Sequence, residues 1–498
     1  MASSKDLFIL VKSLTKAEKA FFLKFCNLQQ GEKNYLKVYR EMLKMEEYNE
    51  EKIIKKYKGE KFVKSIHVTR NYLYKQILKS LRSGRVNDLI DTKISNLLVD
   101  ASTLELKGLY EQSFALLKKA RALAQDYHKL PYLLQVIQRQ INHVINIKTK
   151  NLSETVDHYY EEAVRAGEHY AQEWHYYELN HRLFSLYRKH GRKKQSAEVE
   201  TILYDMMSER TLHVFPAEGT FYSRYLFHNI HAISHLIKTE FSEARKHYEA
   251  IISIWESHPK IVEEKPHLYK IHVSNYLNCL HWNSDYEPFM KAIEKLENLR
   301  SRSFDEEAET FQNVVLLKLL YYLNTQQFEK GKELAEPIEA GLKKYASKVN
   351  KAREITLWYN MTVLYFASED YGEALGALGR ILHDERSEIR QDMQRFSRIL
   401  ELIFHYELGN TEVLEFFYRS TIRKLKRKGG MDEYEETVLN YLKSIFFAVN
   451  KREAIDHLED LRDALEKFKQ SQKKLLGYGE LMIWIGNKLG ETDKGQPV

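Results

Sequence analysis

The chain has 498 residues, of which 43% are hydrophobic and 30% charged, and its formal net charge is +7 at neutral pH. This length allows several compact domains or one long solenoid, and a content of only seven prolines favours an ordered, mostly helical chain. The two cysteines, Cys26 and Cys279, lie far apart and outside any CxxC motif. A disulfide framework and a cysteine-based zinc site are therefore not expected, and a reducing compartment is.

No segment approaches the ~20 consecutive apolar residues of a membrane span. The apolar run from Leu7 to Val11 near the N-terminus is too short for the core of a signal peptide. We therefore expect a cytoplasmic protein without membrane insertion.

Positive charge is concentrated in residues 1–85. This segment holds 20 Lys and Arg against 9 Asp and Glu, a net charge of +11. Subtraction from the totals of 77 and 70 leaves 57 against 61 for the rest of the chain, a net charge of −4. The difference predicts that residues 1–85 form a separate basic domain with contacts of its own.

This basic domain is predicted to be helical. Thr15 and Glu18 have the spacing of a capping box and precede an apolar run that extends through Phe25, which predicts the start of a helix. Hydrophobic periodicity predicts further helices over 33–45, 50–57 and 61–83.

The last of these helices carries a basic face. With the short helix before it and the turn at 58–60, it faintly resembles a helix-turn-helix, in which basic side chains neutralise phosphates and an amide reads a base edge. The candidate nucleic-acid contacts are Lys64, Asn71, Lys75, Lys79 and Arg82. The same pattern also fits a solvated helix face or a surface that docks on an acidic patch.

The stretch 355–381 has the pattern of a helical hairpin. A first mostly apolar stripe is followed by the polar residues Ser368, Glu369 and Asp370, and then by a second stripe with a small residue at Ala374. A small residue there lets two helices approach closely. Because one hairpin cannot bury both of its faces, the sequence predicts a stack of hairpins.

The pattern of this hairpin repeats from residue 86 onward. Aligned on Glu369, the turns are spaced 40 to 48 residues apart and fall at Gly108, Lys150, Gly191, Thr239, Ser284, Gln326, Glu369, Gly409 and Asn450. A large apolar residue often stands two positions after the turn, and a small residue often stands five positions after it. We predict an all-α fold: an α-solenoid of about nine hairpins over 86–490, followed by a disordered tail at 491–498.

This pattern resembles the tetratricopeptide repeat. Five residues match its large, aliphatic, small, aromatic and alanine positions, in this order: Trp358, Met361, Thr362, Tyr365 and Ala374. The spacing of about 42 residues is longer than the family's unit of about 34 residues, so the helices are lengthened. The resemblance implies a superhelix whose inner groove holds a peptide or protein partner.

The resemblance also implies particular groove contacts. Peptide-binding members of the family place Asn on the inner face of the first helix, where its amide bonds the backbone of the ligand. The candidate partner-binding residues here are Asn275, Asn278, Tyr359 and Asn360. The lysines of the carboxylate-clamping members are absent, because Ile271 and Thr356 stand at their positions. Asn is also an ordinary exposed helix residue, so this assignment competes with a purely structural one.

Three histidines share one predicted helix face. His228, His231 and His235 are spaced by three and four residues, and the last two have the spacing of metal ligands. The repeat alignment places them at inner packing positions, and no cysteine or carboxylate on the same face completes a ligand set. We therefore expect core or groove histidines, no metal site and no cofactor.

No local catalytic motif is found in the sequence, so an enzyme is not expected. The sequence predicts a non-enzymatic helical-repeat adaptor or scaffold that binds a protein or peptide along the solenoid. The alternative is a nucleic-acid-associated regulator that binds DNA or RNA through residues 1–85 and uses the repeats as a sensor or partner-binding module.

Overall fold

A computed structural model describes residues 4–27, 33–83, 89–146, 152–190, 197–301, 303–382, 389–427, 430–471 and 475–490. These residues form helices and connecting turns, and no strand occurs among them, so the predicted all-α fold is confirmed. The chain divides into two compact units. One comprises Met1–His175 and Glu218–Ser223, and the other comprises Tyr176–Ala217 and Arg224–Val498.

The first unit begins with the predicted N-terminal helices. Its elements are α1 (Ser4–Ser13), α2 (Lys16–Asn27), α3 (Asn34–Lys44), α4 (Glu50–Lys56), the 3₁₀ helix η1 (Lys61–Ser65), α5 (Ile66–Ser83), α6 (Ile90–Leu106), α7 (Tyr110–Asp126), α8 (Leu130–Asn146) and the first part of α9 (Leu152–His190). The helices before residue 84 enclose an apolar core that includes Leu7, Phe22, Tyr39 and Ile77. A second core, which includes Ile94 and Leu117, lies among α6–α9.

The capping box predicted at the start of α2 is present. The Glu18 backbone N–H donates to Thr15 Oγ1 at 3.2 Å, and the Thr15 backbone N–H donates to Glu18 Oε2 at 2.8 Å. Two of the backbone donors at the helix start are satisfied in this way. The predicted helix over 61–83 is also present, although its first turn is the 3₁₀ helix η1. The predicted domain boundary at 85 and 86 and the predicted tail at 491–498 lie outside the described residues.

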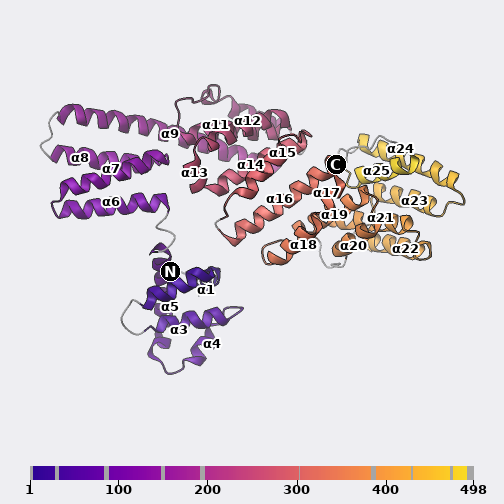
Figure 1. The fold of residues 1–498 in the computed structure, drawn as a ribbon, viewed down its shortest axis with the longest axis horizontal. Coiled ribbons are helices and arrows are strands. Elements are labelled where there is room, and N and C mark those ends of the chain that lie inside the picture. Colours follow the sequence, from indigo (N-terminus) through magenta and orange to yellow (C-terminus); the bar gives the residue numbers. More distant parts are fainter. Residues whose placement is uncertain are drawn as a thin grey trace. The chain divides into compact units, whose positions relative to one another are not determined.

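The second unit is a helical solenoid in which helices close in sequence pack on one another (Figure 1). It contains the end of α9, α10 (Ala197–Met207), η3 (Arg210–Leu212), most of α11 (Phe221–Ile237), α12 (Phe241–Glu256), α13 (Pro259–Glu264), α14 (Pro266–Trp282), α15 (Phe289–Asn298), α16 (Phe304–Asn324), α17 (Phe328–Lys332), α18 (Ala335–Lys344), α19 (Lys351–Ala367), α20 (Tyr371–Leu382), α21 (Gln391–Glu407), α22 (Thr411–Arg427), α23 (Glu433–Phe446), α24 (Lys451–Ser471) and α25 (Tyr478–Leu489). In the described part of the chain, no helix has the length and apolar character needed to cross a membrane.

The predicted turns share one backbone conformation. The backbone angle φ is positive at six of the predicted turn residues: Gly108, Thr239, Ser284, Gln326, Glu369 and Gly409. At Glu369, for example, the Asp370 N–H donates to the Tyr365 carbonyl at 2.9 Å, and the Glu369 N–H donates to the Phe366 carbonyl at 3.0 Å. These are the two hydrogen bonds of a Schellman motif, which ends a helix by turning one residue into the left-handed region.

Of the remaining three predicted turns, one lies among the described residues. Lys150 and Gly191 lie outside the described residues. Asn450 caps the start of α24 instead, with its Oδ1 accepting from the Glu453 N–H at 3.0 Å. The small residues after the turns do permit close helix crossing: Ala244 and Ala374 are fully buried, and a Cβ at Gly331 would lie 2.2 Å from Leu364 Cδ1.

The conformation of Thr239 predicts a stabilising substitution. This residue has φ 60° and an exposed side chain, and a β-branched residue in the left-handed region is strained. Thr239→Gly should raise the free energy of unfolding by about 1 kcal/mol, measured by denaturant titration. Gly409→Ala is the opposite control, since Gly409 has φ 71° and open space around its Cβ position. It should lower stability by a similar amount, and a shift of both variants in the same direction would contradict the explanation.

The last helix, α25, closes on the middle of the solenoid. It packs on α19 and α24, and Leu481, Trp484 and Ile485 are buried in the core of the unit. The Trp484 indole N–H donates to Glu407 Oε1 at 2.7 Å, and Asn487 Nδ2 donates to Glu369 Oε1 at 3.0 Å. One side of α19, which includes Tyr359, is therefore covered by the chain's own α25.

Candidate binding sites

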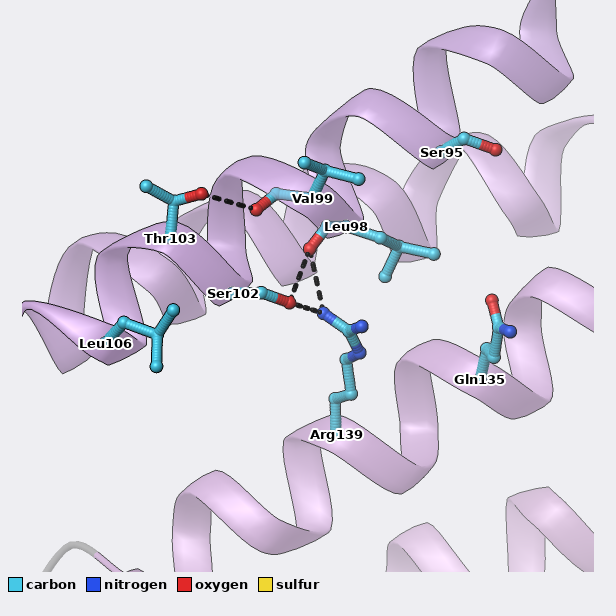
Figure 2. Close-up of a pocket in the computed structure, with 8 residues that line it drawn as sticks. All are labelled: Ser95, Leu98, Val99, Ser102, Thr103, Leu106, Gln135 and Arg139. Atoms are coloured by element: carbon cyan, nitrogen blue, oxygen red, sulfur yellow. Dashed lines mark hydrogen bonds between the residues drawn. The ribbon is translucent and has the colours of Figure 1, made fainter.

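A groove runs between α6 and α8 in the first unit (Figure 2). It begins as a cavity of about 370 Å³ that is lined by Ser95, Leu98, Val99, Ser102, Thr103, Leu106, Gln135 and Arg139. A second cavity of about 380 Å³ shares three of these residues and is lined by Ser102, Glu105, Leu106, Tyr110, Arg139, Asn142 and His143. We call the two cavities together the α6–α8 groove.

Arg139 lies at the centre of this groove. Its side chain extends from α8 toward α6, where Nη1 donates to the Leu98 carbonyl at 2.8 Å and to Ser102 Oγ at 2.6 Å (Figure 2). Within the described part of the chain, the guanidinium makes no further hydrogen bond or ion pair. Because a guanidinium has five N–H donors, several remain available to a ligand.

The walls of the groove are partly aliphatic. Leu106 is 90% exposed and Val99 is 64% exposed, although each stands on a helix that buries its other face. Val99 stands nine positions before its turn at Gly108, as Asn275 and Asn360 do before Ser284 and Glu369. Val99 therefore occupies the same helix position in its hairpin as Asn275 and Asn360 do in theirs.

One end of the groove is closed by a buried imidazole. His143 stacks on Phe114 with 4.7 Å between ring centroids, and its Nδ1 has no hydrogen-bond partner among the described residues. Burial lowers the pKa of His143 below its usual value, so the ring is neutral at pH 7. The positive charge of the groove therefore comes from Arg139.

The predicted partner-binding residues fall in two places. Asn275 and Asn278 are half-buried on α14, and the Asn275 side chain hydrogen-bonds the Tyr248 hydroxyl. Tyr359 is only 3% exposed, and its hydroxyl donates to Glu480 Oε1 at 2.7 Å. Asn360 Nδ2 donates to the Thr356 carbonyl of its own helix at 2.8 Å. The structure does not bring the four residues together, and their role in partner binding stays a prediction.

Tyr359 and Asn360 face a small cavity beneath α25. The cavity measures about 120 Å³ and is lined by Leu320, Leu323, Asn324, Tyr359, Asn360, Val363, Met393, Leu476 and Glu480. Burial raises the pKa of the Glu480 carboxyl, although the hydrogen bond from Tyr359 opposes this shift. Because α25 lies over this position, Tyr359 is not open to an external partner in this structure.

The predicted nucleic-acid contacts lie at the surface of the N-terminal helices. Lys64 is exposed on η1, while Asn71, Lys75, Lys79 and Arg82 follow one another along α5 at intervals of four, four and three residues. The three cations on α5 are exposed, and the helix buries a different stripe that includes Leu73 and Ile77. The predicted basic face is therefore present, and nucleic-acid binding stays a prediction.

The histidines of α11 lie close to a further histidine on α12. Each of His231, His235 and His247 offers a ligand atom, and these atoms all lie within 4.8 Å of one another. Sequence reasoning missed His247. A usable signal was present, because His231 and His247 stand eight residues on either side of the turn at Thr239, and such positions face each other in a helical hairpin. We call these three residues, with His228, the histidine cluster.

Neighbouring groups orient the imidazoles of this cluster. His235 Nδ1 lies 2.6 Å from Glu240 Oε2, and His231 Nε2 lies 3.1 Å from the Leu212 carbonyl oxygen. His228 Nδ1 lies 3.0 Å from His247 Nδ1. Burial, reinforced by the neighbouring histidines, lowers the pKa of His247 to about 3 and that of His228 to about 4. Both rings are therefore neutral at pH 7.

Comparison with known proteins adds no relative for this chain: no protein-family model matches it, and no curated protein does. The resemblance of the repeats to the tetratricopeptide pattern therefore rests on their residues alone. Function has to be argued from the surfaces described above.

Proposed function

We propose that this chain is a non-enzymatic, tetratricopeptide-like helical-repeat adaptor of the cytoplasm that binds a segment of another protein in the α6–α8 groove. The observation that carries the proposal is the exposed aliphatic wall of Val99 and Leu106 beside the guanidinium of Arg139. Cys26 and Cys279 are buried and form no disulfide in the described part of the chain, which is in keeping with a reducing compartment.

The lining of the groove indicates the chemistry of the partner. Burying Leu106 and Val99 against an aliphatic side chain contributes about 25 cal/mol for each Å² of apolar surface removed from water. The free N–H groups of Arg139 favour a carboxylate, because a guanidinium binds a carboxylate through two parallel hydrogen bonds. Gln135 and Asn142 supply amides for the backbone of the ligand. The expected ligand is a segment with an aliphatic residue next to Asp or Glu.

Selection from a displayed library of random peptides tests this proposal. The full chain should select peptides that share an aliphatic residue beside Asp or Glu, with affinities measured by fluorescence anisotropy on synthetic copies. Leu106→Asp and Arg139→Ala should each weaken binding about 10-fold or more, since a charged hydrogen bond or a buried aliphatic contact contributes about 1.5–3 kcal/mol. Leu106 is largely exposed, so its substitution leaves the fold intact.

Matched substitutions outside the groove serve as controls. Val449 is as exposed as Leu106, and Arg419 is an exposed arginine on α22, so Val449→Asp and Arg419→Ala make the same chemical changes elsewhere. Neither should alter the affinity of the selected peptides. Peptides that bind all four variants as tightly as the unmodified chain would reject the assignment of the groove.

A further inference from the structure

The histidine cluster has the composition and the spacing of a metal site. His231 and His235 stand four residues apart on α11, so both side chains project from one face of the helix. His247 reaches the same place from α12, and the candidate ligand atoms of the three residues lie within 4.8 Å of one another. The two helices of one hairpin thus bring three imidazoles close together.

Partners outside this triplet fix which ring nitrogen is free. The Leu212 carbonyl can only accept, so His231 carries its proton on Nε2 and keeps a lone pair on Nδ1. The Glu240 carboxylate accepts from His235 Nδ1, which leaves the lone pair of His235 on Nε2. A carboxylate or carbonyl bonded to the far nitrogen of a histidine is the arrangement that orients metal-binding imidazoles.

A fourth imidazole holds the third ligand. His228 Nδ1 and His247 Nδ1 lie at hydrogen-bonding distance, 3.0 Å, and the two rings have centroids 5.3 Å apart. His228 does not belong to the set whose ligand atoms all lie within 4.8 Å. We therefore assign it a positioning role on His247.

We infer that His231, His235 and His247 bind a late first-row transition-metal ion such as Zn²⁺, with Glu240 and His228 positioning the ligands. Imidazole donors suit Zn²⁺, Ni²⁺ and Cu²⁺, whereas Mg²⁺ and Ca²⁺ require oxygen ligands. Zn–N bonds of about 2.0–2.1 Å place tetrahedral ligand atoms roughly 3.3 Å apart. The His247 ring is stacked on those of His231 and His235, with centroids 5.0 and 5.5 Å apart, so the imidazoles rotate out of this stacking to bind the ion. Three protein ligands leave one coordination position for water or another group.

Metal binding would connect α11 to α12 across the turn at Thr239. An ion that binds only the folded chain raises the free energy of unfolding. The increase grows with the logarithm of the ratio of the ion concentration to its dissociation constant. The melting temperature should therefore rise with added Zn²⁺. This effect is independent of the peptide-binding proposal, since the α6–α8 groove belongs to the other unit.

Calorimetric titration of the full chain, purified without a polyhistidine tag and stripped with a chelator, tests the inference. We expect one Zn²⁺ per chain with a dissociation constant in the micromolar range or below, binding of Ni²⁺, and no binding of Mg²⁺. His235→Ala and His247→Ala should each abolish the stoichiometric site. Glu240→Gln, which keeps all three ligands, should weaken binding about 10-fold.

His457→Ala is the matched control. His457 is a half-buried histidine on α24 that lies 3.9 Å from Glu453 one helical turn away, so it shares the local setting of His235 outside the cluster. Zn²⁺ affinity and the Zn²⁺-dependent rise in melting temperature should be unchanged in this variant. Absence of stoichiometric Zn²⁺ binding in the unmodified chain, or stoichiometric binding that survives in His235→Ala or His247→Ala, would overturn the assignment.

Discussion

Replacing Trp484 with alanine should lower the free energy of unfolding by about 4 kcal/mol. Trp484 is 1% exposed in the core of the second unit, and its indole N–H donates to Glu407. The substitution leaves a large cavity and removes one hydrogen bond from the mostly buried Glu407 carboxylate, which keeps its ion pair with Lys488. Denaturant titration measures the loss, and limited proteolysis should show early cleavage at α25 because this helix would no longer be held on α19.

Trp174→Ala is the control for this prediction. Trp174 is a tryptophan of α9 with 58% of its surface exposed, so its removal creates no internal cavity. Its effect should stay within about 0.5 kcal/mol, as is usual for surface substitutions. Comparable losses in the two variants would show that α25 is not an integral part of the core.

Acidification should destabilise the protein through His272. This residue of α14 is buried between Tyr225 and Trp255, whose ring centroids lie 5.5 and 5.8 Å away, and burial lowers its pKa to about 4. Between pH 6.5 and 4 the unfolded chain binds a proton at this position that the folded chain does not bind. Stability therefore falls as the pH is lowered through this range, by about 3 kcal/mol for this group, since each pKa unit corresponds to about 1.36 kcal/mol.

The His272→Gln variant isolates this contribution, because the other buried histidines are unchanged in it. Free energies of unfolding should be measured at pH 7, 5.5 and 4 for both proteins. The loss of stability on acidification should be smaller by about 3 kcal/mol in the variant than in the unmodified chain. Identical pH profiles would mean that folding does not lower the pKa of His272.

Local sequence patterns predict the elements of this fold well. The Thr15 and Glu18 capping box and six of the turns were predictable because each depends on residues within about one helical turn. Asn450 is predicted as a turn residue, but its side chain caps the start of α24. Asn is favoured both in the left-handed region and as an N-cap, so its presence fits either role.

The candidate sites depend on contacts that local patterns do not encode. The α6–α8 groove requires Arg139 to meet Leu98, 41 residues earlier, and no motif marks that pair. Tyr359 could be placed on α19, but its cover by Glu480 comes from a helix 121 residues later. The contact of His247 with His231 is easier to predict than these two. Both residues belong to one hairpin and lie at equal distances from its turn, so the sequence alone indicates that they face each other.

The closure of α25 on α19 also bears on synthesis at the ribosome. A repeat array with contacts only between neighbours can fold hairpin by hairpin as it emerges. Here Trp484 belongs to the same core as Tyr359, and Glu480 accepts a hydrogen bond from Tyr359, 121 residues earlier. The nascent chain therefore leaves the Tyr359 side of α19 uncovered until α25 has emerged from the exit tunnel, and this is the interval in which a chaperone has access to that surface.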